Sequence, residues 1–184
     1  RLGLVDPAVD RGLKRLLSLR LWMPELELPS FDRDELIILL PELCAGKRSF
    51  QELRSAPVLD TLRSRLTHRQ TRALEQEAPE RLEVPSGSRI ALVYEPGKPP
   101  VLAARIQELF GLHDSPRIAG GRVPVLLHLL APNGRPQQVT EDLRSFWDTT
   151  YQEVRRELRG RYPKHSWPED PWNAPPVRGA VKRR

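Results

Sequence analysis

Apolar residues recur at intervals of three and four through the first 80 residues, which is the spacing of amphipathic helices. Leucines between residues 13 and 19 stand among basic residues and predict a helix that ends before Pro24. A second helix is expected after Ser30, its predicted N-cap, with acidic residues in its first turn and Gly46 at its end.

The helical spacing continues toward residue 80 in shorter pieces. A short helix is predicted to open at Ser49 and to carry Phe50 and Leu53. Another begins at Pro57, and it continues or restarts over residues 69–77. These patterns predict a helical N-terminal half.

After residue 80 the apolar period changes to that of mixed structure. Residues 84–87 read Val-Pro-Ser-Gly, a combination typical of a type I turn, and residues 89–94 alternate as in a strand. A helix is then expected from Pro100 to Gly111, because one helical face would collect five apolar side chains: Leu102, Ala103, Ile106, Leu109 and Phe110.

A hairpin is predicted after this segment. Residues 123–130 form an apolar run of strand length, and Asn133-Gly134 is a strong hairpin signal. The return strand over residues 137–139 follows Pro136, which suits the edge of a sheet because proline has no backbone N–H to donate.

The last predicted helix runs from Thr140, its expected N-cap, to Gly160. Trp147 shares an apolar stripe with neighbours at helical spacing, so we expect a core residue there. The fold class is therefore α+β, with a helical N-terminal half followed by a small antiparallel sheet packed with two helices.

The net charge of +6 is concentrated at the C-terminal end of the sequence. Residues 151–184 hold nine basic and four acidic side chains, a balance of +5. A basic end on a nearly neutral body indicates a polyanionic partner such as nucleic acid, or else a solubilising tail. The sequence begins at Arg1 without methionine or an apolar signal segment, so we expect a piece of a longer protein.

Side chains that carry catalysis or bind cofactors are not found in any recognised spacing. The glycine-rich phosphate-binding pattern of ATP sites is absent, and the four histidines have no metal-ligand spacing. The single cysteine, Cys44, excludes a disulfide framework and is interpreted as a small buried apolar residue. We therefore predict no catalytic, cofactor-binding or metal-binding residue, and no ATP binding or hydrolysis by this chain.

Cations and aromatic rings alternate just beyond the last predicted helix. Phosphates bind cations and exposed bases stack on rings, so this stretch is the candidate nucleic-acid interface. The alternative is that Tyr162 and Trp167 pack this segment onto the helices while its charges stay solvated. The candidate residues are Arg155, Arg156, Arg159, Arg161, Tyr162, Lys164 and His165.

Several of these segments together resemble the C-terminal domain of HrpB-type bacterial ATP-dependent helicases, in the DEAH/RHA group. The resemblance covers roughly residues 58–172. It is carried by the segments at residues 85–90, 99–111, 121–130, 135–136, 139–140, 142–143, 146–147, 161–165 and 167–171.

The resemblance implies a cytoplasmic parent protein whose RecA-like motor domains use ATP and Mg²⁺ to move along nucleic acid. It implies a lead-in segment over residues 1–57, the domain itself over 58–172 and a basic flexible tail over 173–184. The expected function is an accessory domain of an RNA helicase that contacts single-stranded RNA or supports the upstream motor domains of the same chain. The alternatives are a purely structural docking module on those domains and a docking site for another protein.

Overall fold

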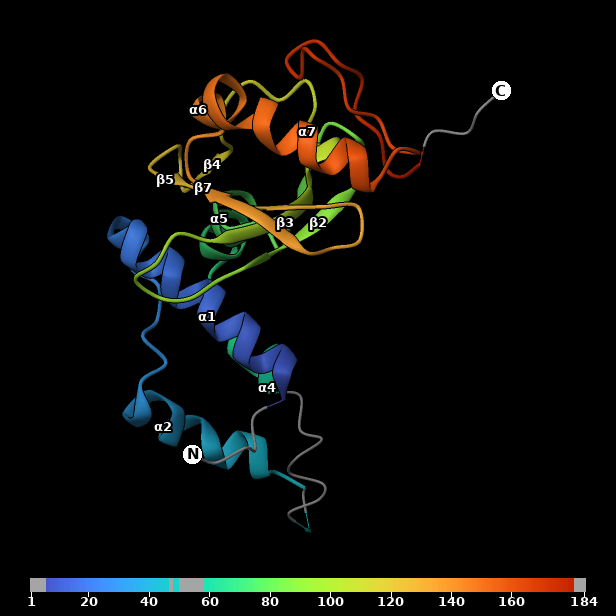
Figure 1. The fold of residues 1–184 in the computed structure, drawn as a ribbon. Coiled ribbons are helices and arrows are strands. Elements are labelled where there is room, and N and C mark those ends of the chain that lie inside the picture. Colours follow the sequence, from blue (N-terminus) through green and yellow to red (C-terminus); the bar gives the residue numbers. More distant parts are fainter. Residues whose placement is uncertain (1–5, 47, 50–57, 181–184) are drawn as a thin grey trace. The chain divides into compact units, whose positions relative to one another are not determined.

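The computed structural model describes residues 6–46, 48–49 and 58–180, and the chain divides into two compact units. The helical unit comprises Arg1–Pro79 with Tyr94–Lys98, and the sheet unit comprises Glu80–Val93 with Pro99–Arg184. Figure 1 shows helices dominating the first and strands the second. In the described part of the chain, no helix combines the length and the hydrophobicity that crossing a membrane requires.

Helices form the helical unit as the periodicity predicts, although one predicted cap is wrong. The N-cap of the second helix is Asp32, whose carboxylate accepts from the backbone N–H groups of Asp34 and Glu35, while the Ser30 hydroxyl donates to Asp32. The short helix expected at Ser49 lies largely outside the described residues. The observed elements are α1 (Pro7–Trp22), η1 (Pro24–Leu26), α2 (Arg33–Cys44), α4 (Val58–Ser64) and α5 (His68–Glu77).

A buried arginine and an exposed cysteine stand out in the helical unit. Arg15, one of the basic residues among the leucines of the first helix, is 3% exposed and donates hydrogen bonds to the carbonyls of Leu74 and Ala78. The Ala78 carbonyl lies just beyond the end of α5, where carbonyls lack intrahelical partners, so the buried guanidinium satisfies it. The Leu74 carbonyl accepts from the backbone N–H of Ala78 as well as from Arg15. Cys44, interpreted as buried, is exposed at the end of α2.

A mixed five-stranded sheet organises the sheet unit, in the order β1-β2-β3-β6-β7. Its neighbouring strands are antiparallel except for β3 and β6, which pair in parallel, and β7 is an edge strand as predicted. A separate two-stranded sheet contains β4 and β5. The strands are β1 (Arg81–Glu83), β2 (Arg89–Val93), β3 (Val101–Arg105), β4 (Arg117–Ile118), β5 (Val123–Pro124), β6 (Leu126–Leu130) and β7 (Pro136–Thr140).

The α+β class is confirmed, but the helix predicted after Pro100 is wrong. That segment forms β3 and a 3-10 turn, η2 (Ile106–Glu108). Leu102 and Ala104 are buried while Ala103 is exposed, so the segment also fits the alternation of a strand. β3 is the central strand and pairs on both sides, which helical periodicity alone does not reveal.

The last helix is interrupted by a π-helical turn. It consists of α6 (Leu143–Ser145), η3 (Phe146–Thr150) and α7 (Tyr151–Arg161), and it lies on one side of the sheet in Figure 1. Its N-cap is Asp142, whose side chain accepts from Ser145, so the predicted cap at Thr140 is wrong by two residues. Gly160, the predicted end, is the penultimate residue of α7.

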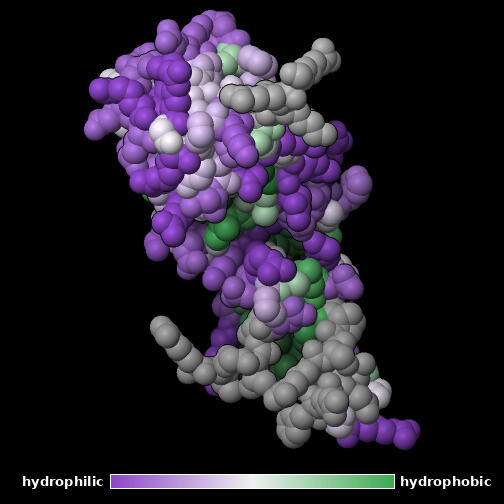
Figure 2. Space-filling view, turned by 45° about the vertical axis from the view of Figure 1, so that its right-hand side comes forward, coloured by the Kyte–Doolittle hydropathy of each residue, from purple (hydrophilic) through white to green (hydrophobic). Residues whose placement is uncertain are grey.

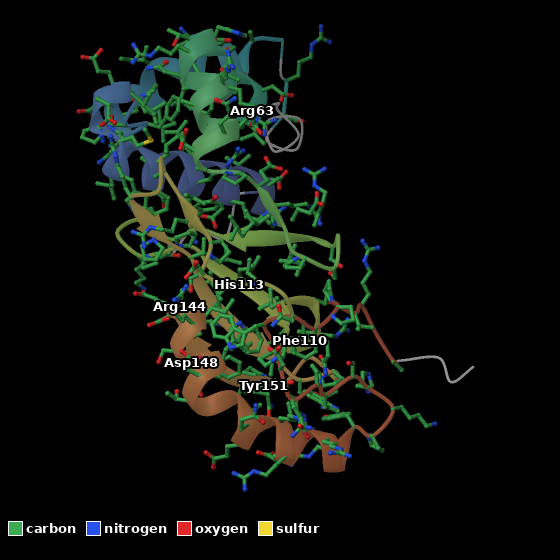
Figure 3. All side chains as sticks on the ribbon, turned by 90° about the horizontal axis from the view of Figure 1, so that it is seen from above. Arg63, Phe110, His113, Arg144, Asp148 and Tyr151 are labelled. Carbon is green, nitrogen blue, oxygen red and sulfur yellow. The ribbon has the colours of Figure 1, made fainter. Side chains whose placement is uncertain are left out.

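Aromatic side chains form the core between this helix and the sheet. Trp147 is 2% exposed, which confirms the prediction that it is a core residue. Its ring lies 5.0 Å from that of Phe146 and 5.2 Å from that of Tyr151. Phe110, two residues after η2, meets Tyr151 edge-on, and Figure 3 shows these two side chains together.

Candidate nucleic-acid interface

The segment after α7, residues 162–178, runs back along that helix, and we call it the C-terminal strap (Figure 1). Three side chains of α7 donate hydrogen bonds to its backbone carbonyls. The pairs are Tyr151 with Pro168 at 2.9 Å, Gln152 with Glu169 at 2.8 Å and Arg155 with Trp167 at 2.9 Å. The strap is therefore a packed part of the sheet unit, and its rings and cations must be judged in that setting.

Three of the seven predicted interface residues, Arg155, Tyr162 and His165, make contacts with the strap or within it. The Arg155 side chain is only 13% exposed, and it also pairs with the Glu169 carboxylate at 3.1 Å. The carbonyl of Tyr162 accepts the indole N–H of Trp167, whose ring is 7% exposed. His165 meets the Tyr162 ring edge-on at 6.0 Å. Arg155 thus joins the strap to α7, and the contacts among Tyr162, His165 and Trp167 lie within the strap.

The other four predicted residues, Arg156, Arg159, Arg161 and Lys164, are exposed on the second half of α7 and just beyond its end. Arg161 forms an ion pair with Glu157 at 3.2 Å, and both side chains are more than half exposed. Arg159 and Lys164 make no ion pair or side-chain hydrogen bond with any described residue. We call Arg156, Arg159, Arg161 and Lys164 the basic end.

The helix dipole and two interspersed carboxylates both act on the charges of the basic end. Arg159 and Arg161 occupy the last turn of α7, where the helix dipole attracts positive charge. Glu153 and Glu157 are interspersed on the same helix, so the positive charge is diluted. In Figure 2 the upper part of the visible face, above the apolar residues drawn in green, is mainly hydrophilic.

A second aromatic and basic region was not predicted from the sequence. The rings of His113 and Trp172 lie 5.5 Å apart and are tilted by 55°. Asp114, next to His113, pairs with Arg144 at 3.3 Å, and His113 and Arg144 are both labelled in Figure 3. The residues come from three distant segments. Only the run Asp170-Pro171-Trp172, a turn signal followed by an aromatic residue, could have pointed to them.

Two glycine-containing turns of the described residues differ from the turn that binds the phosphates of ATP. ATP phosphates bind where a glycine-rich turn leads into a helix N-terminus. Gly87 lies in the turn between β1 and β2, and Gly120 and Gly121 lie in the turn between β4 and β5, so each turn leads into a strand. Within the described ranges, no group of three or more potential metal ligands is found.

Comparison with known proteins identifies the family. The family model described as "ATP-dependent helicase C-terminal" matches residues 39–171. The chain is 44% identical over 173 residues to the ATP-dependent RNA helicase HrpB of Escherichia coli (strain K12), a match that covers 91% of this chain and 21% of the relative.

Two solved structures show the same similarity. The crystal structure of the E. coli DExH-box NTPase HrpB matches with a TM-score of 0.89 and 40% identity, over 96% of this chain and 22% of that one. The crystal structure of the E. coli DEAH/RHA helicase HrpB matches with a TM-score of 0.74 and 39% identity, over 90% and 22%. The chain thus spans about a fifth of the length of these relatives. It belongs to the HrpB family of ATP-dependent helicases, and corresponds to its C-terminal domain.

Proposed function

We propose that this chain is an accessory domain of an ATP-dependent RNA helicase and that its basic end contacts the phosphates of single-stranded RNA. The observation that carries the proposal is the state of Arg159 and Lys164, which are exposed and have no partner among the described residues. The E. coli relative is named an RNA helicase. In this proposal, ATP and Mg²⁺ bind to the upstream motor domains of a cytoplasmic parent protein.

Binding through the basic end has a defined physical signature. Cations that neutralise phosphates release counterions, so affinity falls as salt rises, with a slope of roughly −0.7 per phosphate contact on a single strand. Phosphate contacts carry no sequence information, so binding by this surface has little base preference.

The test is a salt series of RNA binding by two variants with the same change in charge. One variant replaces Arg156, Arg159 and Lys164 by glutamate. The control replaces Arg33, Arg69 and Arg72, which are exposed on the helical unit. We expect the first variant to lose affinity for all RNA sequences alike and to reduce the salt slope by about 2, for three lost contacts. Equal losses in both variants would show a net-charge effect and contradict the proposal.

A second candidate function is docking on the motor domains without RNA contact. The observation that favours it lies in α2, where Ile37, Ile38 and Leu40 are 50%, 74% and 47% exposed. Exposed apolar side chains on one short helix are typical of surfaces that bind another protein surface. The same experiment separates the two functions, because a docking module without RNA contact shows no salt-dependent RNA binding for the basic-end variant to lower.

A further inference from the structure

The three tryptophans of the sheet unit differ in what their indole N–H groups do. Trp147 donates to the carbonyl of Leu112 and Trp167 to that of Tyr162, both at 2.9 Å, and both rings are buried. Trp172 is only half-buried, and no residue in the described part of the chain accepts its indole N–H. Trp172 therefore keeps a polar edge and part of its ring available to a ligand.

The backbone around Trp172 is held rigidly by neighbouring groups. The Asp170 carboxylate accepts from the N–H of Trp172 at 2.9 Å and from the side-chain amide of Asn173 at 2.7 Å. The hydrogen bond from the Asn173 side chain contributes most, and together these bonds lower the pKa of the Asp170 carboxyl below its ordinary value. The carbonyl of Pro171 accepts from Gly111 at 3.0 Å. Gly111 has a φ of +81°, and a Cβ atom there would lie 3.6 Å from the carbonyl oxygen of Ala174.

His113 extends the aromatic surface of Trp172. Its own side chain is exposed, and its ring centre lies 5.5 Å from that of Trp172. The adjacent Asp114–Arg144 pair is solvated, with side chains 72% and 62% exposed, so the guanidinium can exchange this partner for another anion at little cost.

We propose that Trp172 and His113 form a stacking platform for a nucleobase of single-stranded nucleic acid. A rigid, partly exposed indole beside a second ring provides the π-surface that every base can stack on. The free indole N–H adds a donor for a base carbonyl or ring nitrogen. This inference rests on the proposed RNA contact and adds to it the part of the ligand that the basic end does not recognise.

Two of the three carboxylates next to Trp172 and His113 in the sequence are paired with arginines, Glu169 with Arg155 and Asp114 with Arg144. The Asp170 carboxylate accepts hydrogen bonds from neutral groups of Trp172 and Asn173, so it keeps its negative charge. A neutral base tolerates this charge, and the experiment below includes an oligolysine peptide to distinguish a base from a cationic side chain on the ring.

The platform and the basic end lie along the same segment. Lys164 is near one end of the C-terminal strap and Trp172 is farther along it, and the strap follows α7 between them through the bonds of Pro168 and Glu169. A single strand of RNA whose phosphates bind the basic end can thus extend along the strap to the platform.

The experiment compares a short adenylate RNA oligomer with an abasic oligomer of the same length and charge. Trp172→Ala is expected to weaken binding of the adenylate oligomer about tenfold, in line with the loss of one stacked base. Its salt slope and its binding of the abasic oligomer should not change. RNA should also quench tryptophan fluorescence in the wild type and not in Trp172→Phe. Leu21→Ala, at another exposed apolar side chain, is the matched control.

The outcomes separate this inference from the proposed function. RNA binding with an unchanged salt dependence but no effect of Trp172→Ala would overturn the platform alone. If neither oligomer binds, the phosphate proposal fails, and uncharged adenosine is used to test the platform. Quenching of tryptophan fluorescence by adenosine that requires Trp172 supports the platform. The absence of quenching overturns it. Quenching by an oligolysine peptide and not by adenosine also overturns it and assigns the ring to a cationic partner. His113→Ala and a thermal melt of each variant separate lost stacking from lost folding.

Discussion

The packed region around Arg155 and Trp167 and the platform at Trp172 contain similar side chains in different states. Beside the basic end, Arg155 and Trp167 are rich in hydrogen bonds and largely buried, so they fasten the C-terminal strap to α7. At the platform, Trp172 and His113 lie at the surface, and Trp172 has an indole N–H with no acceptor among the described residues. Composition alone would assign both regions the same role.

What separates the two regions is whether a polar group is already paired inside the protein. When a guanidinium or an indole N–H already donates its hydrogen bonds inside the protein, a ligand that takes over those bonds lowers the stability of the fold. An exposed group exchanges only water for the ligand. The comparison therefore assigns holding of the fold to Arg155 and Trp167, and ligand contact to Arg159, Lys164 and Trp172.

The sharpest test of this comparison is truncation of a buried and of a half-buried tryptophan. Trp147→Ala removes a ring that is packed among Phe146, Tyr151 and Phe110, and we expect a loss of about 3–5 kcal/mol in the free energy of unfolding. Trp172→Ala is expected to cost about 1 kcal/mol, as for an average substitution. Denaturant unfolding monitored by circular dichroism measures both, and equal losses would erase the distinction between core and surface rings.

The fold class followed from the sequence because several patterns agreed on it. The helices up to residue 77, the hairpin at Asn133-Gly134 and the strand at residues 89–93 were predicted from periodicity and turn residues, which act locally. β3 was missed because its apolar positions satisfy a helix and a strand equally well, and only pairing with β2 and β6 decides. The π-helical turn contains the buried rings of Phe146 and Trp147, and no local pattern in the sequence predicted it.

The candidate site was predicted only in part, for a related reason. Clustering in sequence located the exposed cations of the basic end, but it could not show that Arg155 reaches a carbonyl twelve residues further along the chain. It also could not bring together His113 and Trp172, which are joined only by tertiary structure. The predicted boundaries at residues 57 and 172 stay predictions.

The second test compares two arginines of α7. Arg155→Ala removes a hydrogen bond to Trp167 and the pair with Glu169, so we expect the free energy of unfolding to fall by about 1.5–3 kcal/mol. Arg159→Ala should change it by no more than about 0.5 kcal/mol. For RNA affinity the order reverses, with Arg159→Ala causing the larger specific loss. A stability loss at Arg159 as large as at Arg155 would mean that the basic end is part of the strap's packing.

The smallest expected effect concerns Tyr151, which fastens the strap from inside the core. Its hydroxyl donates to the carbonyl of Pro168 at 2.9 Å, so Tyr151→Phe should cost about 1 kcal/mol at neutral pH. Burial raises the pKa of Tyr151 above its ordinary value of 10.0, and the nearby Arg155 opposes this only in part.

The pH dependence of this variant follows from the sign of that shift. The unfolded tyrosine ionises once the pH passes 10.0, whereas the folded one stays neutral to higher pH. The stability that depends on neutral Tyr151 is therefore complete below pH 10 and is lost as the pH rises toward the folded pKa. Relative to Tyr151→Phe, the wild type should lose on the order of 1 kcal/mol over the first pH unit above 10. Parallel urea titrations of both proteins measure the difference, and curves that stay a constant distance apart would show that Tyr151 ionises as freely in the folded chain as in the unfolded one.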